Sequence, residues 1–393
     1  MISVSEALDA LFALVDPLPA ESVALSEAAG RVLAQDAIAA RAQPPFPASA
    51  MDGYAIANTE PAPGSQFKVI GEAAAGHAFD GMVGEGDAVR IFTGAPIPKG
   101  GTRVIIQEDV TRSADVITLN TNLDVKTHIR PAAGDFAAGQ PLKAPRRLSP
   151  SEIALLASMN CARPMVARRP TVALIATGDE LVMPGEAPAP DQIIASNSFG
   201  LKAMCEQAGA TVRMIPIAKD TESSLAQALE LAAGNDMIIT IGGASVGDHD
   251  IVGKVAQEQG LARSFYKVAM RPGKPLMAGR IGGAALVGLP GNPVSSMVCG
   301  EVFILPMLRK MLGFPAERRA RTRGTLMKPL AENGPREHYM RARCDLAFAQ
   351  VQAFQLQDSS LLTVLAEANA LIVRPPHDPA KEAGDEVEFI PLG

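Results

Sequence analysis

Aromatic residues are scarce in this chain of 393 residues, and tryptophan is absent altogether. Phenylalanine and tyrosine together supply only 4% of the residues, too few for the stacking platforms that bind single-stranded nucleic acid. Positive charge is not in excess either, because the formal net charge is −6 and the pI is about 5.5. Neither nucleic acid nor an anionic membrane surface is therefore an expected partner.

Cysteine and long apolar runs are also rare. The four cysteines lie far apart and form no CxxC motif, which favours free thiols in a reducing cytoplasm. The longest apolar region, residues 284–312, is broken by Pro290, Pro293 and Glu301, which indicates a buried strand and helix instead of a membrane span. Since no amino-terminal apolar stretch resembles a signal peptide, we expect a cytoplasmic location.

Glycine and proline are abundant by contrast, with 35 and 31 residues, and they divide the chain into short elements. A chain of this length suggests roughly two to four domains. The first 40 residues read as helical, with Ser3 and Glu6 forming a capping box at the start of a helix over residues 5–16. Residues 26–37 could form either a second helix or an extended arm.

Short strand patterns broken by glycine and proline occupy residues 64–130 and predict a small β-domain. After a loop-rich stretch, Ser149 and Glu152 form a second capping box, with Pro150 at the first helical position. The return of a helix after a β-rich insertion suggests that the first domain is discontinuous.

From residue 169 to residue 313 the sequence alternates between strand candidates and helix candidates. Strands are predicted near 171–176, 211–217, 236–241, 264–269, 276–280 and 284–289, and helices near 197–208, 221–233, 250–259 and 293–312. This alternation predicts a three-layer α/β domain with a mostly parallel sheet. Residues 318–393 are β-rich again, with one short helix candidate at 362–368.

Three strand candidates of the α/β region end in turns rich in Gly, Asp or Pro. These turns are TGDEL at 177–181, GGASVGDHD at 242–250 and PGNPVSS at 290–296, and a fourth turn, RPGKP at 271–275, lies between two further strands. Ligands of open α/β sheets bind at the carboxyl ends of strands, where bare backbone N–H groups bind phosphate and other oxyanions. The pattern therefore predicts a site for a nucleotide or another phosphorylated ligand.

Carboxylates in two of these turns suit Mg²⁺ beside such an anion. Asp248 and Asp250 supply the hard oxygen ligands that Mg²⁺ prefers, although Asp250 could also N-cap the next helix. Asp179 and Glu180 stand at the end of another strand. Asp179 and Glu180 could simply belong to an ordinary polar turn. Alternatively, they could act as a general base or help to surround a metal ion at the same edge of the sheet.

Cationic and amide or hydroxyl side chains in the other two turns suit a ligand with several negative charges. Lys267, Arg271 and Lys274 fall within eight residues, and a solvated charged edge is the alternative explanation. Asn292 and Ser295 stand at a helix N-terminus, where the helix dipole favours anions, and an ordinary helix cap explains them almost as well.

One segment also allows a hydrolase interpretation. Gly243–Gly247 matches the nucleophile elbow of α/β-hydrolases, with Ser245 as nucleophile and His338 or His377 as its base. This interpretation is the weaker one, because the elbow should lead straight into its helix, whereas Asp-His-Asp intervenes here.

Two turns in the amino-terminal part carry further polar candidates. Asp52 lies in FPASAMDGYA and Thr93 in IFTGAPIPKG, both stiffened by proline and glycine. Spacing alone does not assign a role to either residue.

Taken together, these motifs resemble those of the molybdopterin molybdenumtransferase family, which includes the MoeA-type proteins and the E domain of gephyrin. The matching motifs are PPFPASAMDGYAI (44–56), TGAPIPKG (93–100), VIIQED (104–109), ATGDELV (176–182), SN (196–197), GGASVGDHD (242–250), MRPGKP (270–275) and GLPGNPVS (288–295). They occur in the family's order and span nearly the whole chain, so the combination is specific although each motif alone is weak.

The resemblance implies a multidomain α/β plus β architecture. Its four domains would be a discontinuous elongated domain (1–43 and 132–168), an inserted small β-domain (44–131), a MogA-like α/β molybdopterin-binding domain (169–313) and a C-terminal β-domain (314–393). It also implies a homodimer whose active cleft lies between the α/β domain of one subunit and the β-insertion of the other.

The reaction implied by the resemblance is a Mg²⁺-dependent step of molybdenum cofactor biosynthesis. Adenylylated molybdopterin and molybdate would react, with release of AMP and placement of molybdenum on the dithiolene. The implied catalytic residues are Asp52, Thr93, Glu180, Asp220 and Asp250, and the implied Mg²⁺ ligands are Glu180, Asp248 and Asp250. The implied substrate-binding residues are Ser245, Lys267, Arg271, Lys274, Asn292 and Ser295, with Arg336, Arg341 and Ser359 from the last domain.

Two alternatives to this reaction are a molybdopterin adenylyltransferase and a non-catalytic dimeric scaffold. An adenylyltransferase would need only the α/β domain, and a scaffold is expected to carry a tail or linker for multivalent assembly. The protein partners to consider are an adenylyltransferase and molybdoenzyme maturation proteins. The sequence does not distinguish molybdate from tungstate, or the carboxylate that acts as base from those that bind metal.

Overall fold

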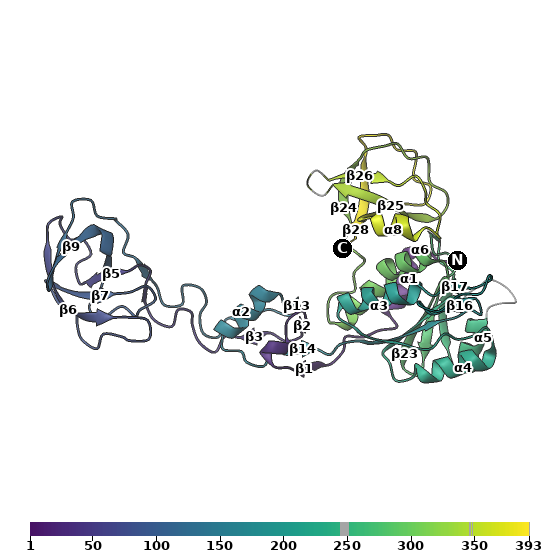
Figure 1. Cartoon of the computed structure of the whole chain (residues 1–393), viewed down its shortest axis with the longest axis horizontal. Coiled ribbons are helices and arrows are strands. Elements are labelled where there is room, and N and C mark those ends of the chain that lie inside the picture. The colour runs from purple at the N-terminus through teal and green to yellow at the C-terminus, as the bar shows by residue number, and fades with distance from the viewer. Residues whose placement is uncertain (244–250, 346, 348, 393) are drawn as a thin grey trace. The chain divides into compact units, whose positions relative to one another are not determined.

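The structure is a computed structural model that describes residues 1–243, 251–345, 347 and 349–392. The chain divides into two compact units, the first formed by Met1–Glu21 and Ala167–Gly393 and the second by Ser22–Val166. Figure 1 shows the elements of both units, each of which is described by itself below. Within the described ranges, no helix has both the length and the apolar character needed to cross a membrane.

The first unit is built around a six-stranded sheet with the strand order β18-β15-β19-β23-β22-β20. Its first four strands run parallel, β22 pairs antiparallel with β23, and β20 pairs antiparallel with β22. The bounds are β15 (Thr171–Ala176), β18 (Thr211–Met214), β19 (Met237–Ile241), β20 (Ala262–Tyr266), β22 (Met277–Ile281) and β23 (Ala284–Leu289). The mostly parallel sheet predicted from the alternating pattern is confirmed.

Helices cover both faces of this sheet, because successive strand residues point to opposite sides. Leu174 and Ile239 belong to the core that includes α1, α3, α6 and α7, whereas Ile175 and Ile238 belong to the core that includes α4 and α5. The bounds are α1 (Val4–Phe12), α3 (Asn197–Ala208), α4 (Glu222–Leu231), α5 (Ile251–Glu258), α6 (Pro293–Cys299) and α7 (Leu305–Met311). The predicted three layers are therefore confirmed, although a π-helical segment, Gly300–Ile304, divides the helix predicted over 293–312.

The C-terminal part of the first unit is a closed β-barrel. β25 pairs with both β26 and β27, and the ring closes through β24 and β28. β21 joins β25 in parallel, with Arg271 opposite His338, and so connects the RPGKP turn to the barrel. The bounds are β21 (Met270–Arg271), β24 (Thr322–Leu326), β25 (Glu337–Asp345), β26 (Gln350–Ala353), β27 (Ala370–Arg374) and β28 (Glu386–Pro391), with α8 at Leu362–Glu367.

The second unit contains another six-stranded sheet, with the strand order β8-β5-β7-β6-β10-β9. The bounds are β5 (Gly53–Ile56), β6 (Gln66–Ala73), β7 (Asp87–Ile91), β8 (Arg103–Ile106), β9 (Val110–Ser113) and β10 (Val116–Leu119). The β-rich character predicted for this part of the chain is confirmed. α2 (Pro150–Ser158) begins at the predicted capping box of Ser149 and Glu152, just as α1 begins at Ser3 and Glu6.

Short strand pairs join the segments that precede and follow the sheet of the second unit. β2 pairs with β13 and β14, β3 with β12, and β4 with β11. The bounds are β2 (Val32–Leu33), β3 (Ala37–Ile38), β4 (Ala48–Ser49), β11 (Ile129–Arg130), β12 (Pro141–Leu142), β13 (Arg146–Arg147) and β14 (Met165–Ala167). The remaining strands are β1 (Ala20–Ser22), β16 (Leu181–Val182) and β17 (Ile193–Ile194).

The helical interpretation of residues 1–40 is correct only for α1. Within residues 26–37 the chain leaves a single 3₁₀ turn at Leu25–Glu27 and then forms the extended arm. Gly30 adopts a φ of 73°, which interrupts a helix, and Leu33 is completely buried in the strand pairing that follows. Long-range pairing therefore overrides the local helical pattern in this segment.

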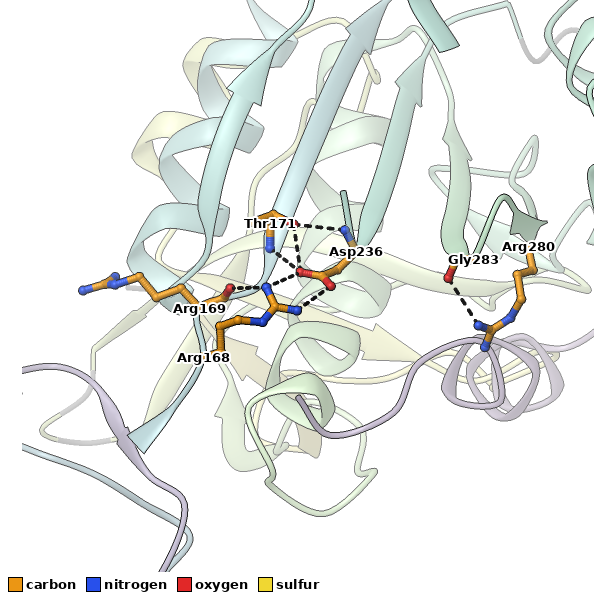
Figure 2. Close-up of polar contacts among 6 residues, drawn as sticks. All are labelled: Arg168, Arg169, Thr171, Asp236, Arg280 and Gly283. Carbon is orange, nitrogen blue, oxygen red and sulfur yellow. Dashed lines mark hydrogen bonds and ion pairs between the residues drawn. The ribbon is translucent and has the colours of Figure 1, made fainter. Parts of the chain in front are cut away.

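The starts of β15 and β19 are tied together by a charged network, which Figure 2 shows. The Asp236 carboxylate accepts hydrogen bonds from Arg168 Nη2 at 2.7 Å and from Arg168 Nη1 at 3.0 Å. It also accepts from the Thr171 backbone N and Thr171 Oγ1, both at 2.8 Å. The backbone N of Asp236 in turn donates to Thr171 O at 3.0 Å, so both strands begin at a fixed level.

Replacing Asp236 by asparagine should destabilise the first unit by about 2 kcal/mol, because a partly buried guanidinium loses its charged partner. Burial alone would raise the pKa of Asp236, but the bonds from Arg168 and Thr171 outweigh it and lower that pKa. Because the pKa of Asp236 is lower in the folded protein than the value of about 4 in the unfolded chain, the ionised carboxylate stabilises the fold above about pH 4. This stabilisation is lost as the pH falls further.

Urea unfolding of the wild-type protein and of the Asp236→Asn variant, at neutral and at acid pH, checks this expectation. The two unfolding midpoints should differ at pH 7 and converge in acid. Glu230→Gln, on the exposed side of α4, is the matched control. Equal midpoints for wild type and Asp236→Asn at pH 7 would contradict the role given to the network.

Candidate active site

A pocket of about 600 Å³ opens where β15, β19 and β23 end. The three turns that follow these strands contribute to its lining, together with the start of α3 and with Pro275 of the RPGKP turn. The polar and backbone groups around it come from Thr177, Gly178, Glu180, Ser196, Asn197, Asp220, Gly242, Gly243, Gly291, Asn292 and Ser360. Turns that are far apart in the sequence thus meet at the carboxyl edge of the parallel sheet, where this class of fold binds ligands.

Two consecutive glycines allow the end of β19 to approach the end of β15. Gly242 and Gly243 have φ values of 91° and 64°, in the region that side chains disfavour. A Cβ atom on Gly243 would lie 2.4 Å from Val252 Cγ2 and 2.9 Å from Thr177 Oγ1. Glycine is therefore required here both by the backbone conformation and by the lack of space.

Acidic side chains gather on one side of the pocket. The backbone N of Asp220 donates to Asp179 Oδ1 at 3.2 Å, and Glu180 lies in the same turn as Asp179. Burial raises the pKa of Asp220, and the negative charges of Asp179 and Glu180 raise it further. Thr221 caps α4 by accepting from Ser224 N, so the Asp220 carboxylate is not used as the helix cap.

The predicted metal ligands are only partly described. Asp248 and Asp250 lie outside the described residues, as does Ser245, which the sequence assigned to substrate binding. Elsewhere in the described chain, no three His, Cys, Asp or Glu side chains are grouped closely enough to hold a metal ion. Glu180 is therefore the one predicted ligand whose position the structure gives.

Asn292 does not act as an ordinary helix cap, although it occupies the residue before α6. Its side chain forms no capping hydrogen bond, and its Nδ2 donates instead to Ser359 Oγ at 3.1 Å. Val294 N also donates to Ser359 O at 3.1 Å, so the barrel loop that carries Ser359 is tied to the turn after β23. Ser295 is buried within α6, with 4% of its surface exposed.

A cluster of cations lies where β21 joins β25. Arg341 is only 1% exposed, and its guanidinium donates to Gln357 Oε1 and to Asp358 O. Arg336 donates to the carbonyl of Met270 at 3.4 Å. Within the described residues both arginines thus bond neutral acceptors, and the Asp358 carboxylate bonds Ser360 instead. An added anion could compensate these charges.

The RPGKP turn presents two further cations. Arg271 and Lys274 are exposed, and their side chains form no hydrogen bond or ion pair with any described residue. Gly273 has a φ of 108°, and a Cβ atom there would lie 2.5 Å from Cys299 Sγ, so the turn packs closely on α6. Lys267 lies further back in the chain, with its Nζ 5.2 Å from the centre of the Tyr266 ring.

Asp52 and Thr93, which the sequence placed in separate turns, meet in the second unit. Thr93 donates to Asp52 Oδ1 from both its backbone N and its Oγ1, each at 2.8 Å. These two bonds lower the pKa of Asp52, and the charge of Arg90 lowers it further. The carboxylate is therefore held ionised and in one orientation.

Comparison with known protein families gives the same order of parts. The model of the MoeA N-terminal region (domain I and II) matches residues 2–160, a probable molybdopterin binding domain matches 173–310, and the MoeA C-terminal region (domain IV) matches 323–392. The chain is 32% identical over 402 residues to a molybdopterin molybdenumtransferase of Staphylococcus aureus, covering 99% of this chain and 95% of that protein. The chain belongs to the MoeA family.

Other members of the MoeA family agree with this assignment. A molybdopterin molybdenumtransferase of Nostoc is 33% identical over 414 residues, covering 100% of this chain and 94% of that protein. The crystal structure of the molybdopterin biosynthesis MoeA protein from Pyrococcus horikoshii superposes with a TM-score of 0.83 at 26% identity, covering 99% of both chains. The multidomain α/β plus β fold expected from the resemblance is thereby confirmed.

Several pocket residues were not singled out by the sequence as parts of a site. Ser196 and Asn197 line the pocket, and Asn197 Nδ2 donates to Gly291 O at 2.7 Å. The usable signal was the SN motif at 196–197, which matches the MoeA family and stands at the start of a predicted helix. Ser360 gave no such signal, because the loop that carries it is far in the sequence from every motif shared with the MoeA family.

Proposed function

We propose that this protein inserts molybdenum into molybdopterin, using adenylylated molybdopterin and molybdate and releasing AMP. The proposal rests above all on one pocket that has carboxylates on one side and a cationic turn at its rim. Water would add to phosphorus, the P–O bond to the adenylate would break, and AMP would leave. Molybdate would then exchange one oxide for the two dithiolene sulfurs, and that oxide would leave as water with the two thiol protons. Arg271 and Lys274 would neutralise the charge of the oxyanion and of the phosphates.

We propose Asp220 and Glu180 as the acid–base groups of this pocket, with Asp250 as a further candidate. The raised pKa of Asp220 supports a role in proton transfer, because a general base works best when its pKa approaches the working pH. Asp52 and Thr93 would complete the set. The proposed substrate-binding residues are Ser245, Lys267, Asn292, Ser295, Arg336, Arg341 and Ser359.

We propose that Mg²⁺ binds at the acidic side of the pocket. Asp179 and Glu180 are close enough to Asp220 to raise its pKa, and a divalent cation would relieve that crowding of negative charge. Glu180, Asp248 and Asp250 are the residues we propose to hold it. The ion would supply charge neutralisation as the P–O bond breaks.

We also propose that the protein works as a homodimer in the cytoplasm. Asp52 and Thr93 belong to a different compact unit from the pocket, and a second copy could bring them to the substrate. The four cysteines are free, as expected for a reducing compartment. A strictly monomeric protein in light scattering would refute the dimer.

We propose two kinds of protein partner for this enzyme. An adenylyltransferase would deliver the substrate, and molybdoenzyme maturation proteins would receive the product.

The direct test is to incubate the purified protein with adenylylated molybdopterin, Mg²⁺ and molybdate, and to measure AMP by chromatography. AMP release that requires molybdate is the expected result. AMP release that is indifferent to molybdate would indicate a different nucleotide chemistry, such as that of an adenylyltransferase. Omission of Mg²⁺ in the same assay tests the metal requirement separately.

Replacing Arg271 or Lys274 by alanine should raise the half-saturating molybdate concentration roughly tenfold, because each change removes a charge-assisted contact of about 1.5 kcal/mol or more. Titration of AMP release with molybdate measures this shift. Lys328→Ala, an exposed cation on the barrel, is the matched control and should leave the curve unchanged. Unshifted curves for both turn variants would show that the oxyanion binds elsewhere.

A further inference from the structure

We propose that Arg90 is the positioning residue for Asp52: it fixes the backbone that carries the Asp52 carboxylate and keeps a positive charge beside it. This inference rests on the proposed function, in which Asp52 takes part in AMP release. Arg90 lies at the end of β7, directly before the turn that carries Thr93, and no motif assigned it a role, which emerges only from its contacts.

The guanidinium of Arg90 is held by two aromatic rings. Arg90 and Tyr54 are direct partners in the antiparallel pairing of β7 with β5. The Arg90 Cζ atom lies 5.1 Å from the centre of the Tyr54 ring and 4.6 Å from that of Phe92. Cation–π contacts at these distances restrict the guanidinium without neutralising its charge.

Hydrogen bonds then connect this guanidinium to two backbone carbonyls, directly to that of Gly53 and through Gln107 to that of Asp52. Arg90 Nη1 donates to Gly53 O at 3.2 Å, and Arg90 Nη2 donates to Gln107 Oε1 at 2.7 Å. Gln107 N donates to Asp52 O at 3.1 Å. The carbonyls of Asp52 and Gly53 are therefore fixed by Gln107 and Arg90, which also bond each other. The backbone at Asp52 and Gly53, here called the Asp52 corner, cannot shift at one carbonyl without disturbing the bond to the other.

The close approach of neighbouring strands reinforces the same corner. A Cβ atom on Gly53 would lie 1.9 Å from Ile105 O, so only glycine allows β5 to lie this close to β8. On the other side, Thr93 fixes the carboxylate through Oδ1. Within the described residues Oδ2 accepts no hydrogen bond, so it is the oxygen that can act on a substrate.

The charge of Arg90 remains available to Asp52. Its hydrogen-bond acceptors are a carbonyl and an amide, and no described carboxylate forms an ion pair with it. The Arg90 charge adds to the Thr93 bonds in lowering the pKa of Asp52. Arginine is suited to this position because its planar fork reaches two acceptors at once, whereas a lysine ammonium on the same strand would lose one of them.

A structural role of Arg90 in packing Tyr54 must be separated from a positioning role, and a double-mutant cycle does so. The variants are Arg90→Gln, Asp52→Ala and the double mutant, assayed for molybdate-dependent AMP release. We expect Arg90→Gln to lower kcat about 10- to 100-fold with little change in KM for adenylylated molybdopterin. In the Asp52→Ala background, Arg90→Gln should have no further effect on kcat.

Titration of the Asp52 carboxyl group by ¹³C NMR provides a second readout that packing would not move. Loss of the Arg90 charge should raise the pKa of Asp52, because the Asp52 carboxylate becomes less favoured. Arg90→Lys keeps the charge and should return this pKa to its wild-type value, with only partial recovery of kcat. An unchanged pKa of Asp52 in Arg90→Gln would count against the inference.

Gln107→Met tests the same network if Arg90→Gln does not fold, because it removes the second acceptor and leaves Arg90 on its two rings. A decrease in kcat that vanishes in the Asp52→Ala background supports the inference. Arg112→Gln, which changes an exposed arginine of the same sheet, is the control and should retain full activity.

The possible failures are distinguishable. If Asp52→Ala alone leaves AMP release unchanged, the proposed catalytic role of Asp52 is wrong, and the inference about Arg90 falls with it. If Asp52→Ala is inactive while Arg90→Gln retains the wild-type kcat, only the inference about Arg90 is refuted. Equal fold-losses from Arg90→Gln in the presence and absence of the Asp52 carboxylate would assign Arg90 to packing.

Discussion

Replacement of Asp220 by asparagine is expected to lower the rate of AMP release by roughly 10²- to 10⁴-fold, the range typical for loss of a positioned acid–base group. Asparagine has nearly the same shape as aspartate, but it cannot accept a proton and is a poorer ligand for a cation. The loss should appear in kcat, because Asp220 stands in the wall of the pocket and not in the cationic turn.

The pH dependence follows from the pKa of Asp220, which burial and the charges of Asp179 and Glu180 raise. In the proposed role the carboxylate form acts as the base, so wild-type activity should fall as the pH decreases through that raised pKa. This fall should begin above pH 4, where an ordinary aspartate is still ionised. The residual activity of Asp220→Asn should lack this acidic limb.

Stability distinguishes this outcome from simple unfolding. A folded-state pKa above the unfolded value means that the native state favours the protonated form, so ionised Asp220 weakens the fold at neutral pH. Asp220→Asn should therefore unfold at the same temperature as wild type or at a higher one. Asp191→Asn, an exposed change between β16 and β17, is the matched control for activity. Full activity of Asp220→Asn would exclude Asp220 from the chemistry.

Acidification should destabilise the first unit through His338. Burial lowers the pKa of His338 to about 4, and the charges of Arg271, Arg341, Arg374 and Arg336 act in the same direction. The unfolded value is about 6.5, so the stabilisation is fully present above that pH and is lost as the pH falls towards 4. The shift corresponds to about 3 kcal/mol over this interval, because one pKa unit is worth about 1.4 kcal/mol.

The His338→Gln variant isolates this contribution, because glutamine is polar and does not titrate. Urea unfolding midpoints should fall steeply for wild type between about pH 6.5 and pH 4, and less steeply for His338→Gln. His377→Asn changes an exposed histidine of the same unit and should reproduce the wild-type slope. Parallel slopes for wild type and His338→Gln would show that His338 is protonated with little cost inside the barrel.

The position of His338 also argues against the role of general base that the hydrolase interpretation gives to this residue. A general base needs an imidazole that can take up a proton near neutral pH. His338 lies in register between Arg271 and Arg374, on β21 and β27, and their charges oppose that protonation. His338 lies among the arginines of the cationic cluster. It is placed there by the pairing of β25 with β21 and with β27, which lie far from it in the sequence.

Local signals were enough to locate most helices and strands. Ser3 with Glu6 and Ser149 with Glu152 marked helix starts that the structure reproduces, because a capping box involves only four consecutive residues. The strand at 171–176 and the helix at 197–208 have the predicted bounds. The pocket at the carboxyl edge also followed from sequence, since parallel strands necessarily bring their terminal turns together.

The sequence by itself therefore determined the class of the fold, the family and the edge at which a ligand site forms, all of which depend on short-range patterns. Only the tertiary structure decided which side chains meet. Asn292 bonds Ser359 across 67 positions in the sequence, Arg90 bonds Gly53 across 37, and no local pattern encodes either pair. Such contacts depend on strand register and on how the barrel packs against α6. These are set by burial of the whole unit, which no single segment specifies.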